Sequence, residues 1–192
     1  EERCFYEIYL KNETERVESL KSEEDEYVRL ARQTLESYVI NRKIIRRPDD
    51  LSNDMTSNRA GVFVSLKLDG NLRGCIGTTS PTTQSIADEI IQNAISAGAE
   101  DPRFPPVCEE ELKRLVYSVD VLGDAEKIRS ADELNPEKYG VIVSKGHRKG
   151  LLLPNLEGVD TAEEQVSIAL KKAGISPAEN YKLERFEVVR HK

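Results

Sequence analysis

The chain has 192 residues and a formal net charge of −7 at pH 7, which disfavours non-specific nucleic-acid binding because that needs a basic face. Its length suits one large domain or one domain with two lobes. No apolar run approaches the roughly 18 residues of a membrane span, and the first residues lack the apolar segment of a signal peptide, so we expect a cytoplasmic protein without a membrane segment.

The cysteines and histidines also limit the chemistry. Cys4, Cys75 and Cys108 are odd in number and widely spaced, which favours free thiols in a reducing compartment over a disulfide framework. The two histidines, His147 and His191, belong to no recognisable metal-binding spacing. We therefore expect neither a metal site nor a cofactor.

The N-terminal part divides near Ser22. Residues 1–21 open with the strand-like run CFYEIYL and then turn polar, so we interpret them as a tail or linker. Because the chain begins without methionine, a domain cut from a longer protein is one of the options. Ser22 is the predicted N-cap of a first helix, which Pro48 prevents from continuing. Its apolar positions recur with helical spacing: Tyr27, Leu30, Ala31, Thr34, Leu35, Tyr38 and Val39.

A β-hairpin is predicted next. The segment 61–68 alternates in polarity, DGN at 69–71 is a turn signal, and Leu72–Gly77 returns. Alternation places one set of side chains on an apolar face, namely Val62, Val64, Leu66, Leu68, Leu72, Gly74 and Ile76. The opposite face then carries Arg73, Cys75 and Gly77.

The remaining elements alternate between helices and strands. We predict a helix over Thr83–Ala99, a stiff proline loop over 100–112, and a strand over 115–122. A helical turn at 130–134 precedes a second hairpin, formed by 139–146 and 149–154 around His147. Thr161 and Glu164 form a capping box for a helix that ends at Gly174, and 181–189 is a final strand. Together these patterns indicate an α+β fold with an antiparallel or mixed β-sheet and packed helices.

Four blocks resemble one family. LRGCIG (72–77), GVFVSL (61–66), DPRFPPV (101–107) and GLLLP (150–154) are similar, in this order, to the AMMECR family, named for a human chromosomal region linked to Alport syndrome, midface hypoplasia and elliptocytosis. The likeness runs from Ser22 to the C-terminus, so 22–192 is the AMMECR-like domain. It departs at Asn155, where the family commonly has Gln.

The resemblance implies a two-lobed fold whose characteristic residues lie near a cleft. It implies no known reaction, because the family's activity is not established. In microbes the family is associated with Memo-like proteins, which are similar to class III extradiol dioxygenase subunits, and with radical SAM proteins. Some members are fused behind a Memo-like domain, and this chain fits such a C-terminal domain. A Memo-like domain or a radical SAM protein is therefore the partner that the resemblance suggests.

Cys75 is the first candidate catalytic residue. Arg73 would stabilise its thiolate, while Gly74 and Gly77 leave room for a substrate and expose backbone N–H groups to a developing oxyanion. The alternative is that Cys75 is a small buried residue and that the glycines serve a bulge or close helix packing.

Three further residues complete the candidate site. Asp101 and Arg103 would bind a small anionic substrate together with Arg73. The alternative is that the segment Asp101–Arg103 is a loop held by its own salt bridge. His147 is a weaker candidate for the base of a Cys–His pair, against the alternative of an exposed turn histidine.

Two hypotheses for function follow. In the first, the domain is an enzyme that uses Cys75 on a small anionic substrate. In the second, the same surface binds a ligand or a partner without breaking a bond. The scarcity of histidine favours the second, although Asp101 or Glu100 could serve as a base.

Overall fold

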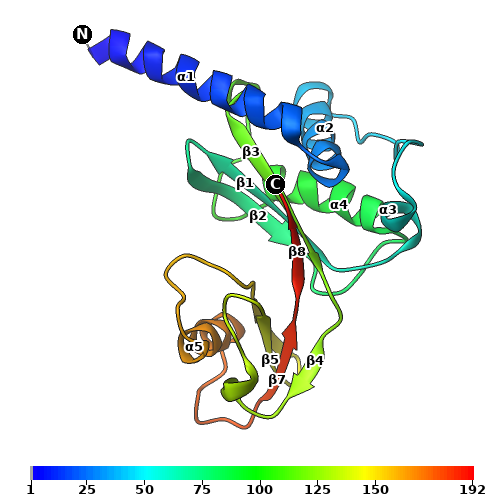
Figure 1. Ribbon diagram of the computed structural model, residues 1–192, viewed down its shortest axis with the longest axis vertical. Helices are drawn as coiled ribbons and strands as arrows, with labels where there is room; N and C mark the ends of the chain where they lie inside the picture. Colours follow the sequence, from blue (N-terminus) through cyan, green and yellow to red (C-terminus); the bar gives the residue numbers. More distant parts are fainter. Residues whose placement is uncertain (1) are drawn as a thin grey trace. The chain divides into compact units, whose positions relative to one another are not determined.

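A computed structural model describes residues 2–192, which form two compact units (Figure 1). One unit contains the chain up to Val121 together with Arg190–Lys192, and the other contains Leu122–Val189. Each unit has its own sheet and its own helices, and the strand pairs are antiparallel. The predicted α+β class is confirmed. That the characteristic residues line a cleft stays a prediction.

The sheet of the first unit has the strand order β2-β1-β3-β8. The strands are β1 (Val62–Leu68), β2 (Asn71–Gly77), β3 (Leu115–Leu122) and β8 (Val188–His191). Ser65 lies opposite Cys75, so the predicted hairpin is confirmed. Asp69 and Gly70 make its turn with positive φ angles of 51° and 82°, a conformation that Asp and Gly tolerate better than other residues.

One feature of β2 differs from the expected alternation. Leu66 lies opposite Gly74, but the next residue, Lys67, lies opposite Leu72, so Arg73 is an extra residue in the ladder. This bulge turns Leu72 to the side of Lys67, where its side chain is 43% exposed. The prediction that Leu72 joins the apolar face was therefore wrong, because strict alternation does not hold across a bulge.

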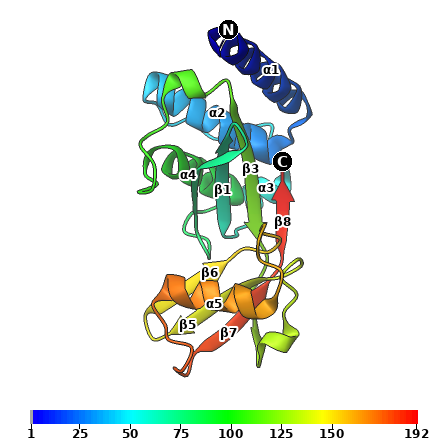
Figure 2. The ribbon, with the colours of Figure 1, turned by 90° about the vertical axis from the view of Figure 1, so that its left-hand side faces the viewer.

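Helices α2 (Glu26–Asn41) and α4 (Ile86–Ala99) build the core against one face of this sheet (Figure 2). The short helix α3 (Asn53–Ser57) contributes Met55. Helix α2 begins later than predicted, because the carboxylate of Asp25, rather than Ser22, accepts hydrogen bonds from the first backbone N–H groups. The most deeply buried core side chains include Leu30, Leu35, Met55, Val62, Val64, Leu66, Ile90 and Val119.

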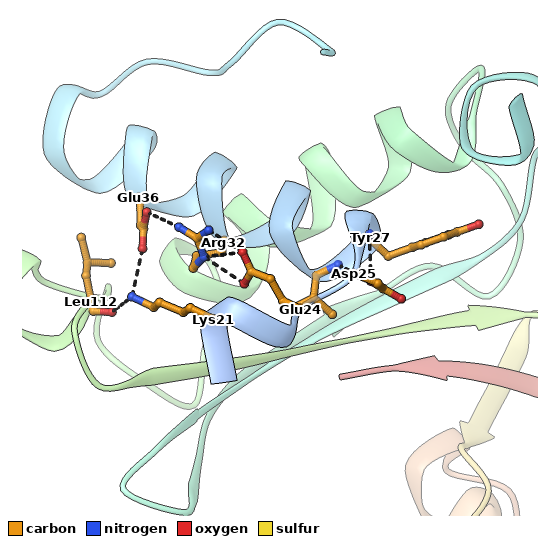
Figure 3. Close-up of polar contacts among 8 residues, drawn as sticks. Lys21, Glu24, Asp25, Tyr27, Arg32, Glu36 and Leu112 are labelled. Carbon is orange, nitrogen blue, oxygen red and sulfur yellow. Dashed lines mark hydrogen bonds and ion pairs between the residues drawn. The ribbon is translucent and has the colours of Figure 1, made fainter. Parts of the chain in front are cut away.

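The first 21 residues lie largely within a helix, α1 (Glu2–Glu23), so the expectation of a strand-like run at CFYEIYL was wrong. Its less exposed residues recur at helical spacing: Leu10, Glu13, Thr14, Val17 and Lys21. Lys21 forms an ion pair with Glu36 of α2 and donates a hydrogen bond to the carbonyl oxygen of Leu112 (Figure 3). The assignment of residues 1–21 as a tail or linker stays a prediction.

Charged residues also join the end of α1 to α2 (Figure 3). Arg32 donates hydrogen bonds to Glu24 and Glu36, and Glu36 in turn pairs with Lys21. The side chains of Arg32 and Glu24 are only 17% and 7% exposed, so solvent screens this network weakly. It joins the C-terminal end of α1 to α2 within the first unit.

The second unit has a sheet with the order β4-β7-β5-β6 and one helix, α5 (Ala162–Ala173). Its strands are β4 (Glu126–Ile128), β5 (Gly140–Lys145), β6 (Arg148–Leu152) and β7 (Lys182–Phe186). The predicted second hairpin and the Thr161–Glu164 capping box are confirmed. Gly174 ends α5 with φ 64°, as predicted. Two 3₁₀ turns complete the chain, η1 (Glu109–Glu111) in the first unit and η2 (Ala131–Glu133) in the second.

The final strand is two strands rather than one. The chain breaks at Glu187, so that β7 belongs to the sheet of the second unit and β8 to that of the first. Arg190 on β8 donates two hydrogen bonds, of 2.7 and 3.2 Å, to the buried carboxylate of Asp120 on β3. His191 stacks on Tyr27 with 3.8 Å between the ring centroids.

Candidate functional site

Cys75 lies on β2, the edge strand of the first sheet. Its cross-strand neighbour is Ser65 on β1, and Ser65 in turn lies opposite Ser118 on β3. These three residues form a row on the face opposite the core. The Ser65 hydroxyl donates a hydrogen bond of 3.2 Å to the Cys75 sulfur. The prediction that Cys75 faces away from the apolar side is thereby confirmed.

The DPR loop closes the outer edge of β2 at this residue. The Asp101 carboxylate accepts a hydrogen bond of 2.9 Å from the Cys75 N–H, and the Arg103 guanidinium donates one of 3.2 Å to the Cys75 carbonyl oxygen. Arg103 also pairs with Asp101, through Nε at 2.9 Å and Nη2 at 2.7 Å. Two side chains therefore occupy the place of a neighbouring strand, which protects an exposed sheet edge.

The charge of Asp101 is held firmly by this arrangement. Arg103, together with the N–H groups of Cys75 and Arg103, lowers the pKa of the Asp101 carboxyl well below its usual range despite its burial. Asp101 is therefore ionised throughout the physiological range. A carboxylate engaged in this way is a poor general base.

Arg73, the bulge residue, points to a different partner from the one expected. Its guanidinium pairs with Glu111 through hydrogen bonds of 2.6 and 2.9 Å and donates another, of 3.0 Å, to the Pro105 carbonyl oxygen. Its side chain is 11% exposed. The ring of Phe104 lies near both arginines, 5.9 Å from Arg73 and 5.5 Å from Arg103. Arg73 thus anchors the proline loop.

The two glycines near Cys75 serve packing. A Cβ on Gly74 would lie 2.1 Å from the Ala97 carbonyl oxygen, so the absence of a side chain lets α4 approach β2 closely. A Cβ on Gly77 would lie 2.2 Å from the ring of Phe63, the residue opposite it on β1. These contacts favour the packing alternative for the glycines.

The environment of Cys75 favours the thiol over the thiolate. Burial raises the pKa of Cys75, and the hydrogen bond from Ser65 and the charge of Arg103 only partly offset that effect. Asp120 and Asp101 raise it further. This is the opposite of the lowered pKa that a nucleophilic cysteine needs at neutral pH.

The loop after Cys75 is held by a buried carboxylate, Glu89 on α4. Glu89 accepts five hydrogen bonds of 2.5 to 3.0 Å from hydroxyl and backbone N–H groups of Thr78, Thr82 and Thr83. Burial acts to raise the pKa of Glu89, but these donors outweigh it and hold the pKa below its ordinary value. The loop 78–83 is thus organised around one negative charge.

The structure brings together most of the predicted site residues. Hydrogen bonds and close contacts join Cys75, Asp101 and Arg103, and Phe104 links them to Arg73. Gly74 and Gly77 flank this cluster on the same strand. His147 lies in the second unit, exposed in the turn between β5 and β6. That these residues bind or transform a substrate stays a prediction.

Sequence reasoning did not identify three residues of the cluster. Ser65 was visible as the outward residue of an alternating strand, so its place beside Cys75 follows from the hairpin register. Glu111 and Glu89 carried no such signal, because acidic residues are common in this chain and only tertiary packing selects these two. Within residues 2–192, no group of three or more His, Cys, Asp and Glu side chains is arranged to hold a metal ion. No described helix is long and apolar enough to cross a membrane.

Comparison with known proteins identifies the family. A model of the AMMECR1 family matches residues 28–191. A protein of Clostridium acetobutylicum is 54% identical over 176 residues, which cover 91% of this chain but only 37% of the relative. A protein of Thermotoga maritima is 50% identical over 171 residues, covering 88% of this chain and 98% of that relative.

A solved structure agrees with these sequence matches. The crystal structure of an uncharacterized protein from Pyrococcus horikoshii superposes with a TM-score of 0.80 at 34% sequence identity, covering 85% of this chain and 88% of that one. The family match spans nearly all of the chain, and the relatives exceed the identity at which a fold is shared. The chain therefore belongs to the AMMECR1 family.

Proposed function

We propose that the domain is a binding module, in which the cluster around Cys75 contacts a ligand or partner without breaking a bond. The observation that carries this proposal is the commitment of both cluster arginines to internal carboxylates, Arg73 to Glu111 and Arg103 to Asp101. A catalytic thiol would need a nearby uncommitted cation or base to form its thiolate. Burial instead raises the pKa of Cys75.

Arg103 is the contact residue in this proposal. Its side chain is 53% exposed, although Nε and Nη2 are held by Asp101 and by the Cys75 carbonyl oxygen. No hydrogen bond of its Nη1 is seen within residues 2–192, so this nitrogen can donate to an incoming carboxylate or phosphate. A guanidinium already fixed by Asp101 loses little conformational freedom on binding. A small anionic ligand, or an acidic side chain of a partner, fits this site.

The partner of the domain is part of the proposal. The family resemblance supports a Memo-like or a radical SAM protein, and the Clostridium relative is long enough to hold a further domain, since this chain spans 37% of it. A cytoplasmic location is also proposed, and the three free thiols at Cys4, Cys75 and Cys108 support it.

The binding test compares two arginine variants. Purified Memo-like and radical SAM proteins from the same organism are titrated into the 192-residue chain and its variants by calorimetry. We expect Arg103→Gln to weaken binding about fivefold or more, since it removes the exposed charge. Arg46→Gln, at an exposed arginine outside the cluster, is the matched control. Because Arg103 also closes the β2 edge, thermal unfolding of each variant is measured beside the titration.

The second candidate function is an enzyme that uses the Cys75 thiol, and one observation favours it. The charge of Arg103 and the Ser65 hydroxyl both lower the pKa of Cys75, although less than burial raises it. Alkylation by iodoacetamide at neutral pH separates the two candidates. A binding module predicts slower labelling of Cys75 than of the exposed Cys4 and Cys108 until the protein is unfolded. Fastest labelling at Cys75 would overturn the binding proposal in favour of the enzyme.

A further inference from the structure

A pocket of about 480 Å³ lies in the second unit, where the strands β4, β7 and β5 are neighbours in the sheet. Its lining consists of Lys127, Ile128, Arg129, Ser144, Tyr181, Lys182, Leu183 and Glu184. Ligand pockets in proteins commonly measure about 300 to 1,000 Å³, so this one has room for a small organic molecule. None of its lining residues belongs to the cluster around Cys75.

The pocket opens on the face of this sheet that α5 does not cover. Val143 on β5 and Leu183 on β7 pack with the apolar side of α5, so their side chains mark the covered face (Figure 2). Ser144 and Lys182 are their neighbours in sequence and lie opposite each other in the ladder, so these two project from the other face. The pocket lining includes Ser144 but not Val143, which assigns the pocket to that other face.

The charges of the β4–β7 pair are matched at two positions. Glu126 lies opposite Arg185 and forms an ion pair with it at 3.2 Å. Lys127 lies opposite Glu184, again with opposite charges. Opposite charges across two strands are stabilising, whereas like charges directly opposite each other are destabilising. Glu184 is the one carboxylate of the pocket lining, and it faces a lysine.

The next charged row is not matched. Strand β4 ends at Ile128, opposite Leu183, so the same register continued by one residue places Arg129 beside Lys182. Both side chains are exposed, and neither forms an ion pair within residues 2–192. One further carboxylate, Glu133, accepts a hydrogen bond of 2.8 Å from the Arg129 backbone N–H but lies outside the lining. Three cations and one carboxylate line the pocket, so positive charge remains in excess even when Glu133 is counted.

A neutral donor stands beside the unmatched pair. Ser144 on β5 lies opposite Lys182, and its half-buried hydroxyl makes no hydrogen bond in the part of the chain that the structure describes. A guanidinium binds two oxygens of a phosphate at once, an ammonium adds a point charge, and a hydroxyl donates to a third oxygen. The row from Arg129 through Lys182 to Ser144 supplies these three groups from neighbouring segments of one sheet.

We propose that this pocket binds a small phosphate monoester. Arg129, Lys182 and Ser144 hold the phosphate group, and the organic part of the ligand fills the rest of the pocket, since a phosphate alone occupies only a small part of about 480 Å³. A phosphate monoester near neutral pH carries close to two negative charges, which match the two cations of the row, whereas a carboxylate carries one. Binding therefore removes the repulsion between Arg129 and Lys182.

The binding test is a calorimetric titration of the full chain with phenyl phosphate, at about pH 7.5 and constant ionic strength. We expect a Kd of about 0.1 to 1 mM, binding of inorganic phosphate at least about fivefold weaker, and no saturable binding of phenol. No binding of phenyl phosphate at about 10 mM would overturn the proposal, as would equally tight binding of phenol. Equal affinity for inorganic phosphate would overturn the assignment of an organic ester.

Charge variants test the unmatched row. Arg129→Gln and Lys182→Gln should each weaken binding of phenyl phosphate about fivefold or more, whereas Lys171→Gln, at an exposed lysine of α5, should leave it unchanged. Lys182→Glu should abolish binding and raise the thermal unfolding midpoint of the ligand-free protein by about 1 °C or more, because the row becomes charge-matched. Unchanged binding by either glutamine variant of the row, or a lower midpoint for Lys182→Glu, would overturn the proposal.

Discussion

Replacing Glu89 by glutamine tests how much one buried charge stabilises the first unit. Glu89→Gln keeps the shape of the side chain but turns one acceptor oxygen into a donor and removes the charge on which five hydrogen bonds converge. Hydrogen bonds to charged groups contribute about 1.5 to 3 kcal/mol, against about 1 kcal/mol for neutral pairs. The expected loss is therefore about 3 to 5 kcal/mol, a large part of the stability of an ordinary domain.

Urea unfolding followed by circular dichroism measures this loss. The midpoint of Glu89→Gln should fall by about 1 to 2 M relative to the parent chain. Glu18→Gln, at an exposed glutamate of α1, is the matched control and should shift the midpoint little. A shift below about 0.3 M in Glu89→Gln would refute the idea that Glu89 organises the loop 78–83.

The pH dependence gives a second check. Because the pKa of Glu89 is lowered in the folded state, its contribution is fully present above the pKa of an unfolded glutamate, about 4.3. The contribution is lost as the pH falls through the lowered, folded-state pKa. The difference between the parent chain and Glu89→Gln should therefore be constant near neutral pH and shrink below about pH 4. A difference that stays the same in acid would contradict the assignment of an ionised Glu89.

Three further predictions concern the packing and the caps. Gly74→Ala should lower stability by about 1 to 3 kcal/mol in thermal unfolding, because its methyl group meets the Ala97 carbonyl oxygen, whereas Gly123→Ala, with its nearest atom at 3.4 Å, should cost less. Arg73→Met should cost about 3 to 5 kcal/mol in urea unfolding by leaving Glu111 without its partner, and adding Glu111→Leu should recover most of that loss; no recovery would argue against the pair. Thr161→Ala should destabilise α5 by about 1 kcal/mol, measured as faster amide exchange in its first turn, while an unchanged rate would show that the capping box contributes nothing.

The sequence predicted best those structures that are specified by residues close together in the chain. The hairpin, the capping box at Thr161 and the glycine that ends α5 are each specified by residues close together in the chain, so local chemistry was enough to predict them. The face of Leu72 was mispredicted because a bulge shifts alternation by one residue without a distinctive sequence sign. The run CFYEIYL was misread because its aromatic residues favour strands, while helical spacing appears only further along, from Leu10 to Lys21.

In the candidate site, too, the sequence identified residues in motifs but not the contacts that depend on tertiary packing. Cys75, Asp101 and Arg103 were found because they occur in motif blocks, and the structure does join them. The partner of Arg73 was not predictable, since the choice of Glu111 depends on how the proline loop folds back over β2. The state of the thiol was also beyond the sequence, because its pKa depends on burial by residues distant along the chain.

The pairing of Asp120 with Arg190 has a consequence for when the units can fold during synthesis. The two residues are 70 positions apart, and the whole of the second unit is synthesised between them. At about 5 to 20 residues per second, a ribosome takes roughly 4 to 14 s to cover that distance. During this delay the nascent first unit holds a carboxylate without its cation, and the sheet of the second unit also stays incomplete until its inner strand β7 (Lys182–Phe186) is made, just before Arg190. Both units should therefore become fully resistant to protease on stalled ribosomes at nearly the same chain length, once the segment from β7 to Arg190 has emerged.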